Sequence, residues 1–274
     1  ELISAGIVPM VTIHHWDFPY ELFRKGAWLN DDSPIWFEEY TKVVVDALSD
    51  RVTYWITINE PQCIIGNGYW KGVHAPFLNM GNKDLIHMSH NLLLAHGRSA
   101  KYIRENAKIK PLIGFVPMGP VFTPENDSEE AIDAARRASN DMSNRLFFSN
   151  TWWSDPVFLG KYPEEAYEVF GDDMIHPSKE DMEIISQPLD FYGTNIYFSN
   201  GELINENSQG ASYMSNEYIG IGRNSLEWVI DEECLYWSAK FLYERYGKPI
   251  LIAENGFADL DWVDRNGKVC DTKR

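Results

Sequence analysis

The stretch WITINEP, residues 55–61, begins as an apolar run and ends on an amide, a carboxylate and a proline. A continuous rather than alternating apolar run is typical of a strand covered on both faces, as in a parallel sheet. Pro61 lacks the amide hydrogen that a further ladder bond needs, so we expect the strand to stop there. The stretch predicts a buried strand that presents Asn59 and Glu60 at its carboxyl end.

A second stretch near the other end of the chain has the same design. PILIAENGF, residues 249–257, runs apolar and then presents Glu254, Asn255 and Gly256. Two strands that each end in a glutamate raise the question of whether their carboxylates share one site.

The rest of the chain alternates short apolar runs with segments of helical periodicity. The predicted strands are 8–15, 53–59, 111–118, 189–198 and 249–255, and the predicted helices are 33–50, 83–106, 128–153 and 232–247. This alternation indicates an α/β fold with a parallel sheet. Residues such as those of 199–225 are expected to form loops over the same end of the sheet.

Polar residues gather where the predicted strands end, which is where a (β/α)₈ barrel keeps its active site. They are His14, His15, Trp16 and Asp17, then Asn59 and Glu60, then Asn195 and Tyr197, then Glu254 and Asn255. Since side chains alternate along a strand, His14 should pack on the side opposite to His15. No glycine-rich phosphate loop follows a strand, which argues against a nucleotide-binding fold.

Composition limits the classes of partner. The chain has 274 residues, 44% of them hydrophobic, and a formal net charge of −17. Such a charge repels nucleic acid and anionic membranes, so a neutral substrate is expected. No window is apolar enough to span a membrane, and the first residues resemble no signal peptide. Three cysteines without metal-ligand spacing favour reduced thiols in a cytoplasmic protein.

Two glutamates at a common rim could cleave a glycosidic bond, one protonating the leaving oxygen and the other attacking the anomeric carbon or activating water. Alternatively, each glutamate could cap a helix or pair with an arginine.

Histidines 87, 90 and 96 on one predicted helix lack an acidic or cysteine ligand at suitable spacing, so no metal site is expected.

Four motifs resemble those of glycoside hydrolase family 1, the β-glucosidases and their relatives. They are VTIHHWDFP (11–19), TINEP (57–61), LDFYGTNIY (189–197) and IAENGF (252–257). The resemblance runs in order over nearly the whole chain. It implies a retaining β-glucosidase that needs no cofactor and acts on terminal β-D-glucosyl residues of cello-oligosaccharides or of aryl and alkyl β-glucosides.

The resemblance also implies roles for single residues. Glu60 matches the general acid/base and Glu254 the nucleophile, with the two carboxyl groups about 5–5.5 Å apart. Because Glu254 is ionised nearby, the pKa of Glu60 should be raised. Four residues match the substrate-binding and supporting positions: Asn59 on the 2-hydroxyl, His15 on the 3-hydroxyl, Tyr197 on the nucleophile and Asn195 as a supporting amide. Trp228 resembles a tryptophan that lines the aglycone side.

The chain departs from the family pattern at both ends. Strands three to seven of the barrel are recognisable, whereas strands one, two and eight are not, so residues 1–274 are expected to form a single, partial barrel domain. The open edges should promote homo-oligomers. Two alternatives remain open: a 6-phospho-β-glycosidase, or a catalytically weak truncated barrel that only binds sugar or serves in assembly.

Overall fold

Five parallel strands form the centre of the molecule. The computed structural model describes all residues except 143–145, 200–202, 205–221 and 271–274. The strands are β1 (Met10–His14), β2 (Tyr54–Asn59), β3 (Leu112–Val116), β5 (Phe191–Asn195) and β7 (Ile250–Glu254), hydrogen-bonded in that order. Each pair is parallel. The five predicted strands and the α/β class are therefore confirmed.

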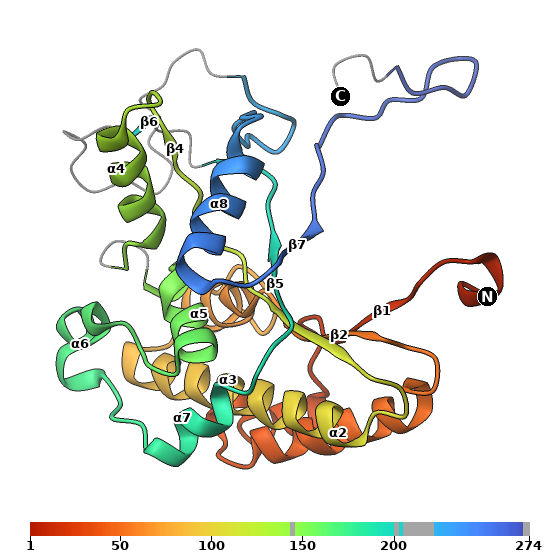
Figure 1. Ribbon diagram of the computed structural model, residues 1–274, viewed down its shortest axis with the longest axis vertical. Helices are drawn as coiled ribbons and strands as arrows, with labels where there is room; N and C mark the ends of the chain where they lie inside the picture. The colour runs from red at the N-terminus through yellow and green to blue at the C-terminus, as the bar shows by residue number, and fades with distance from the viewer. Residues whose placement is uncertain (143–145, 200–202, 205–221, 271–274) are drawn as a thin grey trace.

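Helices connect the strands and cover the outside of the sheet (Figure 1). The described α-helices are α1 (Tyr20–Phe23), α2 (Ser33–Leu48), α3 (Asn82–Asn106), α4 (Glu129–Asn140), α5 (Asn150–Leu159), α6 (Glu164–Phe170), α7 (Lys179–Ile185) and α8 (Cys234–Tyr246). Short 3₁₀ turns lie at η1 (Ile3–Ala5), η2 (Ala27–Leu29), η4 (Leu146–Phe148) and η5 (Gly171–Asp173). A π-helix, η3 (Cys63–Trp70), follows β2. A small parallel pair, β4 (Thr123–Pro124) and β6 (Leu203–Ile204), lies apart from the main sheet.

The prediction of one continuous helix over 128–153 is wrong. The chain leaves the helical conformation at Asp141, which has extended backbone angles, and a new helix begins after Ser149. The Ser149 hydroxyl accepts a hydrogen bond from the amide of Thr151, an N-cap that starts α5. Most of the predicted loop 199–225 lies outside the described residues.

The sheet has a different apolar cluster on each face. On the outer side, Trp55 and Ile113 belong to the large core that the strands share with the helices. On the inner side, Ile56, Val116 and Phe191 form a separate small cluster. Successive strand residues thus face opposite ways, as in the wall of a barrel whose interior is filled by side chains.

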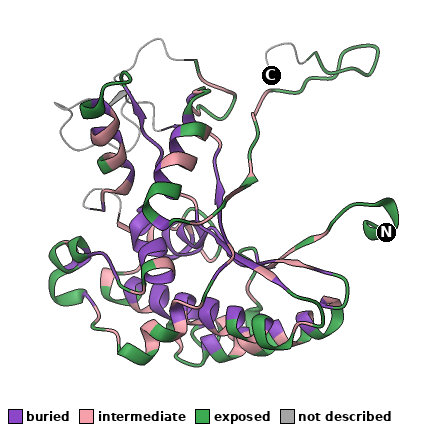
Figure 2. Ribbon diagram, viewed as in Figure 1, coloured by how far each residue is buried: buried purple, intermediate pink, exposed green. Residues whose placement is uncertain are grey.

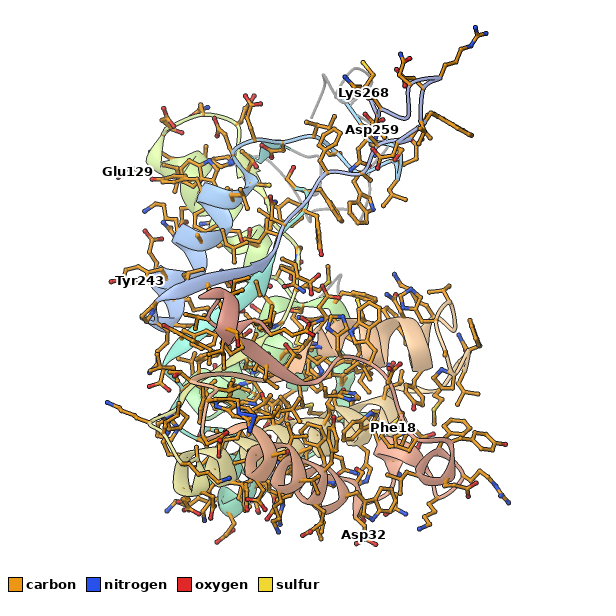
Figure 3. The ribbon with its side chains drawn as sticks, turned by 90° about the vertical axis from the view of Figure 1, so that its right-hand side faces the viewer. Phe18, Asp32, Glu129, Tyr243, Asp259 and Lys268 are labelled. Atoms are coloured by element: carbon orange, nitrogen blue, oxygen red, sulfur yellow. The ribbon has the colours of Figure 1, made fainter. Side chains whose placement is uncertain are left out.

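The two outer strands of the sheet are open among the described residues. β1 pairs only with β2, and β7 only with β5, so the structure is an incomplete (β/α)₈ barrel. β7 and the segment that follows it are largely exposed and point away from the body, whereas the central strands are buried (Figure 2). Turned by 90°, this segment, with Asp259 and Lys268, lies at the end of the molecule opposite Asp32 (Figure 3).

Candidate active site

The polar residues expected at the strand ends do lie at one rim. Asn59 ends β2, Asn195 ends β5 and Glu254 ends β7, while His15 and Glu60 directly follow β1 and β2. Because all five strands are parallel, their carboxyl ends meet at the same end of the sheet.

Glu60 lies at a sharp turn between β2 and η3. Its φ of 46° is in the left-handed region, and its amide donates to the Val116 carbonyl oxygen at 2.7 Å. Its own carbonyl oxygen accepts from the amide of Cys63 at 2.9 Å, which starts the helical turns after Pro61. A non-glycine residue in this region is strained, and such strain is concentrated at functional sites. The turn leaves the Glu60 side chain 6% exposed at the inner rim.

An amide from another strand holds the Glu60 carboxyl group. Asn195 Nδ2 donates to Glu60 Oε1 at 2.7 Å and to Asn59 Oδ1 at 3.1 Å. Asn195 is on β5, and β3 separates that strand from β2. Strands two apart in a flat sheet are about 9.6 Å apart, twice the usual spacing. The contact fits a barrel-like sheet, in which alternate strands aim side chains at a common interior.

His15 joins this cluster at its edge. Its Nε2 lies 3.5 Å from Asn59 Nδ2, and its side chain is exposed. His14 is buried on the opposite side, where its ring packs against Trp28 and Phe37, as expected from strand alternation. Burial lowers the pKa of His14 to about 4, which keeps this ring neutral.

Glu254 has a different set of contacts. The Tyr197 hydroxyl donates to Glu254 Oε2, and the neighbouring Asn255 Nδ2 donates to the Ile196 carbonyl oxygen at 2.9 Å. Burial, together with the Glu254 carboxylate, raises the pKa of Tyr197, so the phenol keeps the proton that it donates. The Trp228 ring lies 5.4 Å from that of Tyr197, which brings this predicted residue to the same side of the site.

The two carboxyl groups differ in their surroundings. Burial is the largest cause that raises the pKa of Glu60, hydrogen bonds from Asn195 and Cys63 oppose it, and the charge of Glu254 adds to the rise. The expected direction is confirmed, but the expected cause is secondary to burial. Glu254 lies half-exposed. Because the charge of Glu254 acts on Glu60, the two carboxyl groups belong to one site. Their separation of about 5–5.5 Å stays a prediction.

Sequence reasoning missed Cys63 and His74, and it gave no role to Trp16, which it placed at the strand end. The Cys63 thiol hydrogen-bonds to the Glu60 carboxyl, and burial together with Glu60 raises the pKa of Cys63, so it stays protonated. Its spacing of three residues from Glu60, one helical turn, was the available signal. Trp16 has a φ of 81°, and its ring lies 5.5 Å from that of His15 and 5.4 Å from that of His74. His74 follows η3 and carries no local signal.

The histidines of α3 have separate partners. His87 Nε2 lies 2.7 Å from Asp31, His90 Nδ1 lies 3.0 Å from the Tyr162 hydroxyl, and His96 Nδ1 lies 2.6 Å from the Thr57 hydroxyl. Across the described part of the chain, no three histidine, cysteine or acidic side chains are grouped as a metal ion would need.

No described helix is both long enough and apolar enough to cross a membrane.

Fold and site together define a class of protein. A (β/α)₈-type sheet that brings two carboxyl groups with different surroundings to the carboxyl ends of its strands is typical of glycoside hydrolases.

Comparison with known families identifies the glycoside hydrolase family. The family model described as Glycosyl hydrolase family 1 matches residues 1–274, and the chain belongs to that family. The chain is 36% identical to the 1,4-beta-D-glucan glucohydrolase of Thermotoga neapolitana over 277 residues, and 37% identical to Beta-glucosidase A of Acetivibrio thermocellus over 281 residues. The solved structure of the family 1 β-glucosidase from Thermotoga maritima superposes with a TM-score of 0.83 at 35% identity.

These relatives are longer than the chain. The matches cover 100% of this chain but 62% and 60% of the two curated relatives, and 59% of the Thermotoga maritima structure. The chain thus spans about three fifths of the length of the relatives that it matches.

Proposed function

We propose that this chain carries the catalytic centre of a retaining β-glucosidase. It would hydrolyse terminal β-D-glucosyl residues of cello-oligosaccharides or of aryl and alkyl β-glucosides by double displacement, as a single partial barrel domain over residues 1–274. The observation that carries this proposal is the contrast between two carboxyl groups at one rim. Glu60 is buried with a raised pKa, while Glu254 is half-exposed and accepts a hydrogen bond from Tyr197.

The contrast assigns one role to each carboxyl group. A general acid must hold a proton at the pH of the reaction, and burial favours the protonated form of Glu60. A nucleophile must be ionised, and the donor hydroxyl of Tyr197 stabilises the Glu254 carboxylate. Glu254 would attack the anomeric carbon while Glu60 protonates the leaving oxygen. Glu60, now a base, would then take a proton from the water that releases the sugar.

The neighbouring polar groups suit a sugar. The Asn59 amide and the His15 ring lie side by side at the rim and would bind the 2- and 3-hydroxyls. Asn195 would orient Glu60, Tyr197 would orient Glu254, and Trp228 would offer an aromatic face to the aglycone. A solved relative, the β-glucosidase from Thermotoga maritima, has been determined in complex with glucoimidazole, which supports a small sugar-like ligand here.

Hydrolysis of a nitrophenyl β-glucoside tests the proposal. We expect the chain to release nitrophenol and both Glu60→Gln and Glu254→Gln to lose at least about 100-fold in kcat/KM. The first sugar released should be the β-anomer, seen by proton NMR before mutarotation. Initial release of the α-anomer would exclude double displacement. A rate equal to that of Glu254→Gln would show that this chain alone is inactive, as in the alternative of a truncated barrel that only binds sugar.

A second comparison addresses the sugar. The net charge of −17 disfavours an anionic substrate, and the relatives cited above are named for glucan or glucoside hydrolysis. We therefore expect nitrophenyl β-glucoside to react faster than its 6-phosphate. Faster reaction of the phosphorylated substrate would favour the 6-phospho-β-glycosidase instead.

We also propose that the open edges of the sheet associate in solution. β1 is unpaired on one side in the described structure, and beside it lies a cavity of about 670 Å³ lined by aromatic side chains such as Trp28, Trp36 and Phe37. Exposed strand edges and apolar surfaces of this kind recruit further chains. Sedimentation should show homo-oligomers, and a stable monomer at micromolar concentration would contradict this.

The free Cys63, Cys234 and Cys270 support action in a reducing compartment such as the cytoplasm.

A further inference from the structure

The buried thiol of Cys63 lies against the carboxyl group of Glu60. Cys63 is the first residue of η3, and its amide donates to the Glu60 carbonyl oxygen at 2.9 Å, which closes a turn. Cys63 is 8% exposed and Glu60 is 6% exposed, so both side chains are shielded from bulk water. The turn brings the thiol and the carboxyl group together, and the two side chains hydrogen-bond to each other.

The thiol is the donor in this bond. Burial, together with the charge of Glu60, raises the pKa of Cys63 well above its ordinary value, so the sulfur keeps its proton. An ionised carboxylate can only accept hydrogen bonds, whereas a thiol is a weak donor. The same sulfur hydrogen-bonds to the side chain of Asn67, which lies one turn further along η3. The thiol therefore has a partner on η3 as well as at Glu60.

Double displacement needs both protonation states of Glu60. The protonated form is the acid of the first step, and the ionised form is the base of the second step. Burial favours only the protonated form, and two side-chain donors oppose it, Asn195 Nδ2 at 2.7 Å from Oε1 and the Cys63 thiol. A buried carboxyl group without such donors would hold its proton too firmly to act as a base near neutral pH.

We propose that Cys63 is a positioning residue for Glu60, whose carboxyl group it holds at the rim through the thiol hydrogen bond and whose ionised form it stabilises for the second step. Cys63 acts through Glu60 and not on the sugar. The catalytic meaning of this role rests on the proposed hydrolase function, whereas the hydrogen bond and its effect on Glu60 do not.

Titration of Glu60 by carbon-13 NMR tests the role of the thiol. The Glu60 signal is assigned by its absence in Glu60→Gln. Cys63→Val fills the space without a donor, and the pKa of Glu60 should rise by about half a unit or more. Cys63→Thr differs from Cys63→Val only by a hydroxyl in place of a methyl group, and it should keep the pKa close to that of the parent.

The other groups that act on this pair are the same in every variant. The titratable ones are Glu254, His15, Tyr197 and Lys71. Cys234→Val is the matched control, because Cys234 is also buried but packs in a different apolar cluster, at the start of α8. It should leave the Glu60 titration unchanged.

The pH dependence of nitrophenyl β-glucoside hydrolysis tests the catalytic part. The basic limb of the kcat/KM profile reports the acid of the free enzyme, so it should move upward in Cys63→Val by the same half unit or more and stay in place in Cys63→Thr. A purely structural defect would lower the rate at every pH without moving the limb. If Cys63→Val does not fold, Cys63→Ala and Cys63→Ser are compared by the same criterion.

An unchanged Glu60 titration in Cys63→Val would overturn the proposal. An equal shift in Cys63→Thr or in Cys234→Val would do the same, as would a shifted titration with an unmoved activity profile. The titration needs no activity. A chain that hydrolyses no glucoside and still shows the difference between Cys63→Val and Cys63→Thr would therefore contradict the proposed function alone.

Discussion

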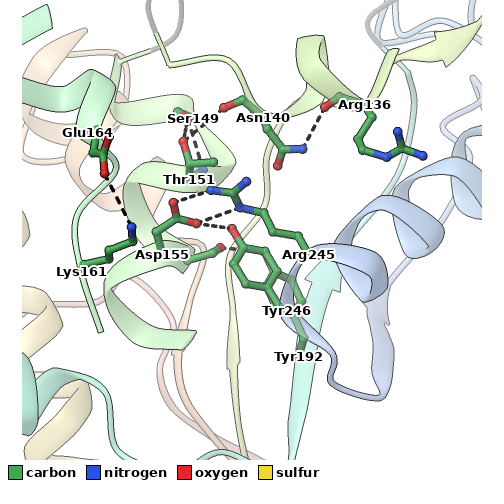
Figure 4. A network of polar contacts seen from close by, with 11 residues as sticks. Arg136, Asn140, Ser149, Thr151, Asp155, Lys161, Glu164, Tyr192, Arg245 and Tyr246 are labelled. Atoms are coloured by element: carbon green, nitrogen blue, oxygen red, sulfur yellow. Dashed lines mark hydrogen bonds and ion pairs between the residues drawn. The ribbon is translucent and has the colours of Figure 1, made fainter. Parts of the chain in front are cut away.

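The ion pair between α5 and α8 offers the sharpest test of how the outer helices are held against the sheet (Figure 4). Asp155 on α5 is 2% exposed and accepts two hydrogen bonds from Arg245 on α8, at 3.0 Å from Nε and 2.6 Å from Nη2. It also accepts from the Tyr246 hydroxyl at 2.9 Å. The Tyr192 hydroxyl of β5 lies 2.7 Å from the Ser154 hydroxyl, which ties the same turn of α5 to the sheet.

We predict that Asp155→Asn destabilises the fold by about 2–3 kcal/mol. Removing one partner of a buried, bidentate pair costs about 3–5 kcal/mol, because the other charge stays buried without compensation. The Arg245 side chain is 34% exposed and keeps part of its hydration, so the expected cost falls at or below the lower end of that range. Urea unfolding, followed by far-ultraviolet circular dichroism, measures the loss as a lower midpoint at an unchanged slope.

Two comparisons make the measurement decisive. Glu164→Gln removes the exposed Lys161–Glu164 pair, whose charged atoms are 3.8 Å apart, and should change stability by less than about 0.5 kcal/mol. Arg245→Met leaves the Asp155 carboxylate buried and should cost more than Asp155→Asn, whereas the double variant should cost less than the sum of the two. The reasoning would be refuted if Asp155→Asn cost no more than Glu164→Gln, or if the two costs at the ion pair simply added.

Three further predictions concern the site and the packing around it. Burial raises the pKa of Glu60, so the contribution of this residue to folding stability is present at low pH and is lost as pH rises through the folded-state pKa. Glu60→Gln should therefore be more stable than the parent at pH 7. In thermal unfolding, the melting temperatures of the two proteins should converge below about pH 4. Tyr197→Phe removes the donor to Glu254 and should lower kcat about 10–100-fold with little change in KM, whereas an unchanged kcat would show that the bond has no catalytic effect. Gly97→Ala would place its Cβ 1.9 Å from a backbone carbonyl oxygen of α7 and should destabilise by about 3 kcal/mol, while Gly81→Ala, which meets nothing within 4 Å, should be nearly neutral in the same urea titration.

The positions and the parallel direction of the strands could be predicted from sequence because each strand carries its own signal. Apolar runs such as residues 55–58 are buried on both faces, and each is separated from the next by helical segments, which leaves a parallel sheet as the consistent arrangement. The break in the helix predicted over 128–153 could not be predicted in the same way. Its helical periodicity continues past Asp141, and the new helix depends on the cap that Ser149 supplies.

The contacts of the site join strands that are not neighbours, and no local pattern encodes such contacts. Asn195 and Glu60 are 135 residues apart and on strands that are not neighbours, yet their side chains are 2.7 Å apart. The motifs identified both residues, but not the bond between them. The cause of the raised pKa was misjudged for the same reason. A neighbouring charge can be inferred from a second glutamate motif, whereas the depth of burial at a strand end depends on everything that packs over it.

The distribution of contacts also explains why the two carboxyl groups can differ so much at one rim. Glu60 follows a central strand with a paired strand on each side, and its donors come from β5 and from η3. Glu254 ends β7, which is paired on one side only in the described structure, and its donor, Tyr197, comes from the segment after β5. The deep burial of Glu60 thus goes with its place after a strand that has a neighbour on each side. Under the proposed double displacement, the more deeply buried Glu60 would be the acid.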